Sequence, residues 1–413
     1  MNNFIRKWFI VAFFNLLLVA LLGMIMRYKL AFPLPAIDQK HTLHSHSHFA
    51  FTGWITQTLM VLLVHYMAQI RNEYCLKKYS WLLYSNLVCS YGMLIFFFFQ
   101  GYSFFSILFS TLSLIVSYTF SIIYWRDLNK VKDPNIGHKW IKASFIFAAI
   151  SSLGAYSLAY MMSNQVVNQR LYLAAIYFFL HFQYNGWFFF AGLGLFFSKL
   201  KNAGTDNLKR KIFWLFAVPC IPTFLLSALW IPFPDWVYWI LIVCVLAQLA
   251  AWVLMLKYLR INRQYLSSMV KTGKTLFILA GIAFTIKLLL QSGSVHPELS
   301  KLSYSFRPIV IGYLHLVLLA VTSVFLLGYI SAFRIIETGK RFKTGVFIFV
   351  TGIILNELLL MIQGVASMTY TATPFMNYLL FFAALTMFIG IFIILLSRIS
   401  DRNHSSTLDN PPY

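Results

Sequence analysis

Charged side chains are scarce in this chain. Asp, Glu, Lys and Arg make up 11% of its 413 residues, whereas hydrophobic residues make up 60%. With a mean hydropathy of +0.74, this composition excludes a water-soluble enzyme. Runs of about twenty apolar residues, long enough to cross a hydrocarbon core as helices, exclude a transmembrane barrel and a single-pass anchor. We therefore expect an all-α, polytopic membrane bundle whose main partner is the lipid bilayer.

Cysteine is also scarce, and sequence motifs for several cofactors are missing. The four cysteines show neither CxxC nor CxxCH spacing, which leaves covalent c-type haem, zinc and iron–sulfur sites without support. No glycine-rich phosphate-binding loop follows a possible strand, which argues against an ATP-driven pump. The cysteines are Cys75, Cys89, Cys220 and Cys244.

Acidic residues are the rarest charged class, with 11 Asp and Glu against 33 Lys and Arg, and the formal net charge is +22. In a soluble protein such an excess would indicate nucleic acid. Here the basic residues lie in the short loops that flank the apolar runs, so we expect no nucleic-acid partner.

The apolar runs predict twelve transmembrane helices. Of the 33 Lys and Arg residues, 26 lie at the termini and in one set of loops, six lie in the opposite loops, and Lys287 lies within a span near its end, where we expect it to snorkel. This asymmetry places both termini in the cytoplasm, in a bacterial cell membrane, with the first span as an uncleaved helix. A polar tail, 401–413, is predicted to be disordered. The predicted spans are 8–26, 45–68, 79–99, 103–125, 139–161, 171–198, 210–230, 236–257, 273–291, 307–330, 343–364 and 375–397.

A short motif repeats along the chain. His48 begins HFAFTGW in the second span, and His181 begins HFQYNGW in the sixth, 133 residues later. A further 134 residues on, His315 lies in the tenth span. A period of four helices predicts one membrane domain, 1–400, built of three four-helix units, roughly 1–130, 131–260 and 261–400. We expect the Gly and Trp of the GW pairs to serve helix packing.

Histidines inside a bilayer indicate function, because a polar ring there is costly unless it is paired or ligated. Imidazole is a ligand for iron and copper, and haem is the apolar cofactor that suits a helical bundle. Basic residues precede the three histidines by eight, eleven and eight positions, where haem propionates would emerge. They are Lys40, Arg170 and Arg307, and interfacial anchoring is their alternative role.

These features resemble subunit I of the haem-copper oxidase superfamily, in particular the cbb3-type oxidase and nitric oxide reductase branch. The resemblance implies a non-covalent b-type haem whose axial ligands are His315 and a histidine at the head of the second span: His48, or His46 or His44. It also implies a copper or non-haem iron ligand at His181, and an electron-donor subunit or quinol as partner. NnrS-type haem and copper membrane proteins are a second resemblance.

The chain departs from the oxidases at several positions. The seventh span lacks a histidine pair, the tenth has His315 alone, and no arginine pair follows the eleventh. The resemblance therefore implies a degenerate relative without a complete binuclear centre, which binds one haem, or one haem and a loosely held copper.

Two further groups are candidate site residues. If the segment with His44, His46 and His48 is helical, His44 and His48 share a face. If the segment is extended, all three histidines could line one side and form a surface copper or zinc site. Glu357, in the eleventh span, could relay protons toward a haem or accept a hydrogen bond from a histidine; a neutral acid bonded within the bundle is the alternative.

Three functions are compatible with these observations. The first is a haem-binding redox protein, with possible oxidoreductase activity toward oxygen or nitric oxide. The second is a twelve-helix transporter with proton-coupling or substrate-binding histidines, which Pro219 and Pro222 in the seventh span would suit. The third is a structural subunit whose histidines only pack. The first explains why the three histidines share a period, a depth and a direction.

Overall fold

The computed structural model describes residues 3–200, 205–231, 233–296, 298–299 and 306–408. Helices and loops make up this described part, without a strand. Within it, ten helices are long and apolar enough to cross a membrane, or eleven if the bent pair of α9 and η3 is one span. The chain is therefore a multi-pass helical membrane protein. The predicted span 171–198 is helical but is not among these ten or eleven.

The helices fall into two compact units, 1–120 with 326–413 and 121–325. The first unit contains α1 (Asn3–Ala31), α2 (Gln39–Phe49), η1 (Ala50–Thr56), α3 (Gln57–Ile70), α4 (Tyr74–Gln100), most of α5 (Phe104–Leu128), most of α15 (Val324–Ala332), α16 (Lys340–Met368) and α17 (Met376–Leu408). The second contains α6 (Ile136–Ser163), α7 (Gln169–His181), η2 (Phe182–Phe188), α8 (Phe189–Lys199), α9 (Asp206–Cys220), η3 (Pro222–Ala228), α10 (Asp235–Ile261), α11 (Arg263–Ser267), α12 (Lys271–Gly293), α14 (Arg307–His315) and η4 (Leu316–Ser323).

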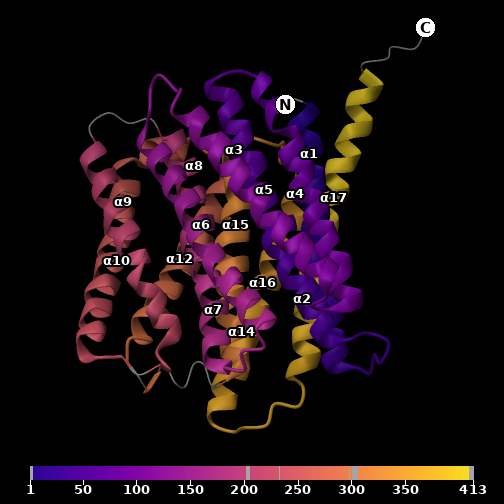
Figure 1. The fold of residues 1–413 in the computed structure, drawn as a ribbon. Helices are drawn as coiled ribbons and strands as arrows, with labels where there is room; N and C mark the ends of the chain where they lie inside the picture. The colour runs from indigo at the N-terminus through magenta and orange to yellow at the C-terminus, as the bar shows by residue number, and fades with distance from the viewer. Residues whose placement is uncertain (1–2, 201–204, 232, 297, 300–305, 409–413) are drawn as a thin grey trace. The chain divides into compact units, whose positions relative to one another are not determined.

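In the first unit, helices from the two ends of the chain lie side by side (Figure 1). The Asn377 side-chain amide of α17 donates to the Leu30 carbonyl of α1 at 3.3 Å. α17 also packs closely on α16, because Gly390, which has no side chain, faces the backbone of Phe349. A Cβ on Gly390 would lie 2.4 Å from the Phe349 backbone nitrogen. Small residues allow helix backbones to approach in this way in membranes.

In the second unit, aromatic side chains from several helices pack around Trp140 of α6, which is fully buried. Its ring centroid lies 4.9 Å from that of Phe190 and 5.3 Å from that of Phe213. The nearby helix pair α9 and η3 bends by 44° between Cys220 and Pro222, because Pro219 and Pro222 lack the amide hydrogen that a continuous helix needs.

Three helices contain a π-helical stretch at corresponding places. η1 begins two residues after His48, η2 begins directly after His181, and η4 begins directly after His315. η2 and η4 contact each other within the second unit. The GW residues pack as expected: Trp54 and Trp187 are buried, and a Cβ on Gly186 would lie 2.5 Å from Phe147.

Residues 401–408 of the predicted polar tail are helical, and the disorder of the tail stays a prediction. α17 continues to Leu408, since no Gly or Pro interrupts the segment before Pro411. Residues 409–413 lie outside the described residues.

Candidate functional site

The histidine-rich segment is helical, so the extended alternative, with three histidines on one side, was wrong. α2 begins after Asp38, whose carboxylate accepts the His41 backbone N–H at 2.7 Å. That hydrogen bond lowers the pKa of Asp38, at the exposed end of the helix. As the helical periodicity requires, His44 and His48 lie on one face and His46 lies on another.

The face with His44 and His48 packs on aromatic rings of the same unit. The His48 ring stacks on Phe97 with centroids 4.2 Å apart, and its Nε2 lies 3.3 Å from the Tyr102 hydroxyl. His44 meets the Tyr102 ring edge to face, with centroids 4.7 Å apart. Its buried Nε2 has no hydrogen-bond partner among the described residues. These two rings are therefore held mainly by aromatic contacts.

His46 points toward α1. Its Nδ1 lies 3.0 Å from the carbonyl oxygen of Val19, and its Cε1 would lie 3.3 Å from a Cβ on Gly23. A carbonyl can only accept, so Nδ1 carries the proton and Nε2 has the lone pair in the neutral ring. Metal-bound histidines have this arrangement, with the second ring nitrogen fixed by a backbone carbonyl.

His315 has the same arrangement on α14 of the second unit. Its Nδ1 donates to the Ile311 carbonyl, one turn earlier in the same helix, at 2.8 Å. The ring is half-buried. Its Nε2 therefore has the lone pair, as in His46.

Protein groups bind both ring nitrogens of His181. Nε2 donates to the Cys220 carbonyl at 2.8 Å, and Nδ1 accepts from the Asn185 carboxamide at 3.1 Å. The ring is 2% exposed. A copper ion would have to displace one of these partners. Nowhere in the described part of the chain do three His, Cys, Asp or Glu side chains gather as a metal site, so the residues around His181 do not fit copper.

The remaining predicted site residues lie on separate helices. The three basic residues expected near propionates are exposed in the first turns of the helices that carry the histidines: Lys40 in α2, Arg170 in α7 and Arg307 in α14. Glu357 is half-buried in α16 and accepts from the Asn356 side chain at 3.2 Å. Its carboxylate thus bonds to an amide rather than to a histidine, and its proposed role as proton relay stays a prediction.

The expectation that Lys287 snorkels was wrong. The side chain is 4% exposed, and its ammonium donates to Gln291 Oε1 at 2.5 Å on the inner face of α12. Its Nζ also lies 5.6 Å from the Phe284 ring centroid. No carboxylate pairs with Lys287 among the residues the structure describes.

Lys287 begins a buried polar network that continues through α10 to the bend between α9 and η3. Gln291 Nε2 donates to Gln248 Oε1 at 2.7 Å, and Gln248 Nε2 donates to Thr223 Oγ1 at 3.4 Å. Thr223 donates in turn to the Pro219 carbonyl at 2.7 Å and contacts the Cys220 carbonyl, which His181 also binds. The network thus joins α12, α10, the bent pair of α9 and η3, and α7 of the second unit.

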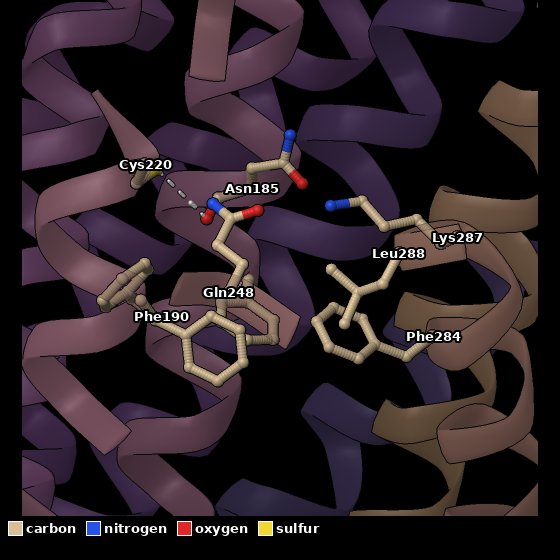
Figure 2. Close-up of a pocket in the computed structure, with 9 residues that line it drawn as sticks. Asn185, Phe190, Cys220, Gln248, Phe284, Lys287 and Leu288 are labelled. Atoms are coloured by element: carbon tan, nitrogen blue, oxygen red, sulfur yellow. Dashed lines mark hydrogen bonds between the residues drawn. The ribbon is translucent and has the colours of Figure 1, made fainter. Parts of the chain in front are cut away.

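A small pocket lies beside this network (Figure 2). The side chains of Asn185, Gln248 and Lys287 point into it, and the Cys220 thiol donates to the Asn185 carbonyl at 3.6 Å. Aromatic rings form its remaining walls: Phe189, Phe190, Phe216 and Phe284. A buried cation, two amides and apolar walls therefore surround one cavity.

The only signals for this network in the sequence were single polar residues within apolar runs. Gln248, Lys287 and Gln291 each lie in such a run, but helical spacing alone does not show that residues 43 positions apart meet. The search of known family models finds no match to this chain, and the search of curated proteins finds none either.

Proposed function

We propose that this chain is a haem-binding redox protein of the membrane, a degenerate relative of subunit I of the haem-copper oxidases. The observation that supports it is the pairing of each of three histidines with a π-helical stretch, at intervals of one third of the chain. π-Helix accounts for well under about 1% of residues in globular proteins and often marks a functional site. Three histidines that merely filled space would not call for the same rare backbone form.

The orientation of two histidine rings supports haem in particular. His46 and His315 each donate Nδ1–H to a backbone carbonyl, at 3.0 and 2.8 Å. Each of these hydrogen bonds fixes its ring and puts the lone pair of the neutral imidazole on Nε2, the tautomer that an axial ligand requires. We therefore prefer His46 to His48 as the α2 ligand, because a backbone carbonyl fixes the His46 ring. A bound haem would carry one electron at a time between a donor and an acceptor.

The proposal includes a finer topology. Twelve spans, both termini in the cytoplasm and three four-helix repeats would place the three histidines at one depth near the outer surface. Haem would be b-type and non-covalent, and its electrons would come from a quinol or a partner subunit. Copper takes no part, because His181 uses both ring nitrogens within the protein.

The test is a reduced-minus-oxidised optical spectrum of the detergent-purified protein, expressed with haem supplied, together with a pyridine haemochrome assay. We expect a Soret band and an α-band in the wild type, and their loss in His46→Ala and in His315→Ala. His65→Ala is the matched control. His65 lies in α3, which follows α2 and η1 along the chain, and its ring is hydrogen-bonded to the Gln69 side chain at 3.0 Å. This variant should retain the full spectrum.

Further variants identify the α2 ligand. If His44→Ala or His48→Ala abolishes the bands while His46→Ala retains them, the assignment to His46 is wrong but the haem stands. A folded wild-type preparation without haem would refute the proposed redox function.

A transporter is the second candidate function, and the 44° bend between α9 and η3 favours it. Broken helices beside buried polar groups form substrate sites in many secondary transporters. The measurement is proton flux into proteoliposomes that contain a pH-sensitive dye. A flux that is present in the wild type and absent in His181→Phe would support transport, whereas equal flux in protein-free vesicles would refute it.

A further inference from the structure

The buried ammonium of Lys287 lacks a counter-charge among the described residues. An isolated charge in an apolar interior is costly, and buried lysines within membranes normally face a partner or a ligand path. Lys287 is 4% exposed and has Gln291 Oε1 as its hydrogen-bond acceptor. An anion beside the ammonium would lower the cost of burying this charge.

The dipoles of the network favour the charged form of Lys287. The hydrogen bonds that lead away from Lys287 all have the same direction. The side-chain amides of Gln291 and Gln248 each accept a hydrogen bond through oxygen from the Lys287 side of the network, and each donates one through nitrogen to the next residue. The last donor is the Thr223 hydroxyl, which bonds to the Pro219 carbonyl. Aligned dipoles of this kind strengthen one another and turn their negative ends toward Lys287.

The same network does not suit proton conduction. Gln248 and Gln291 donate through carboxamide N–H groups, which do not exchange protons with the ease of a hydroxyl, an imidazole or water. The arrangement therefore favours a fixed positive charge rather than a path for proton transfer.

The pocket beside Lys287 offers that charge to a small guest. An ammonium has three N–H donors, and Gln291 takes one of them. The space in which the centre of a water-sized sphere can lie is about 10 Å³, so the pocket takes one small species and no drug-sized ligand. Phenylalanine rings wall it, so it provides few donors to replace a hydration shell.

We propose that this pocket binds one small, weakly hydrated monovalent anion, such as bromide or nitrate, at the Lys287 ammonium. The Lys287 charge supplies the attraction, and the apolar walls select against strongly hydrated anions such as fluoride and sulfate. The site lies in the second unit and is independent of the proposed haem.

The test is calorimetric titration of the detergent-purified wild type with bromide, nitrate and fluoride at constant ionic strength. We expect saturable binding of one bromide or nitrate per chain and none of fluoride. In Lys287→Met, which keeps the length and loses the charge, the affinity should fall by about tenfold or more. Lys274→Met is the matched control, because Lys274 is exposed on the same helix; its affinity should equal that of the wild type.

A second measurement does not depend on a variant that folds. Crystals of the wild type soaked in bromide should show an anomalous peak in the pocket between Lys287 and Asn185. The proposal fails if the wild type binds no anion saturably, if Lys287→Met binds as tightly as the wild type, or if the bromide peak lies only at the basic loops.

Discussion

His181 donates its Nε2–H to the backbone carbonyl of Cys220, 39 residues further along the chain, at 2.8 Å. The bond joins the end of α7, directly before the π-helical stretch η2, to the last residue of α9, where the bend toward η3 begins. A backbone carbonyl next to a break has lost its usual helical donor, so a side chain takes that role. The histidine that the sequence suggests as a metal ligand thus serves as a donor to a broken helix.

Replacement of His181 by Phe should destabilise the protein. The change removes two hydrogen bonds and leaves the Asn185 carboxamide unpaired on that side, which costs about 1–3 kcal/mol. The midpoint of thermal unfolding in detergent measures the loss. Cys220→Ala is the control, because the Cys220 carbonyl remains and the hydrogen bond that its thiol donates is long, at 3.6 Å. Equal stability of His181→Phe and the wild type would contradict the assigned role.

Asn15→Leu should destabilise the first unit through η1. Asn15 is fully buried, donates to the Gly53 carbonyl at 2.6 Å and accepts from the Tyr91 hydroxyl at 2.8 Å. Loss of the Asn15 carboxamide leaves the Gly53 carbonyl in η1 and the Tyr91 hydroxyl without this partner, which should lower the free energy of unfolding by about 1–3 kcal/mol. Tyr91→Phe removes one of these two bonds and should cost less. Thermal unfolding of both variants decides the order, and a larger loss in Tyr91→Phe would overturn it.

Gly390→Ala should separate α16 from α17. The added Cβ would lie 2.4 Å from the Phe349 backbone nitrogen, which has no freedom to move aside. Overpacking of this kind costs about 1–3 kcal/mol. Gly339→Ala is the matched control, because no atom lies within 4 Å of its added Cβ, and it should unfold like the wild type. Similar unfolding midpoints for the two variants would show that the helices are not in close contact at Gly390.

Acid should loosen the start of α2. The His41 backbone N–H lowers the pKa of Asp38 below its ordinary value of 3.8, so the carboxylate stabilises the folded helix end above that value and this contribution is lost as the pH falls through the lowered pKa. Hydrogen–deuterium exchange of the first turn, corrected for intrinsic rates, should show protection that falls below pH 3.8. In Asp38→Asn, which caps without titrating, protection should not change across this range.

Several local features could be predicted from sequence because they depend on neighbours along the chain. The GW glycines and tryptophans pack as expected, and the helical periodicity put His44 and His48 on one face and His46 on another. The period that links His48, His181 and His315 also coincides with the three π-helical stretches. The stretches themselves were not expected, because residue types that form π-helix do not differ visibly from those that form α-helix.

The sequence by itself determined that this is a multi-pass helical membrane protein, because hydropathy and helix length are properties of single segments. Tertiary structure alone decided the surroundings of individual polar groups. Lys287 lies only four residues from the end of its predicted span, 273–291, which predicts snorkelling, yet α12 turns it inward to Gln291 and to a network that includes Gln248 on another helix. Which face of a helix meets protein and which meets lipid depends on its neighbours, and an apolar run that is hydrophobic on all sides does not specify them.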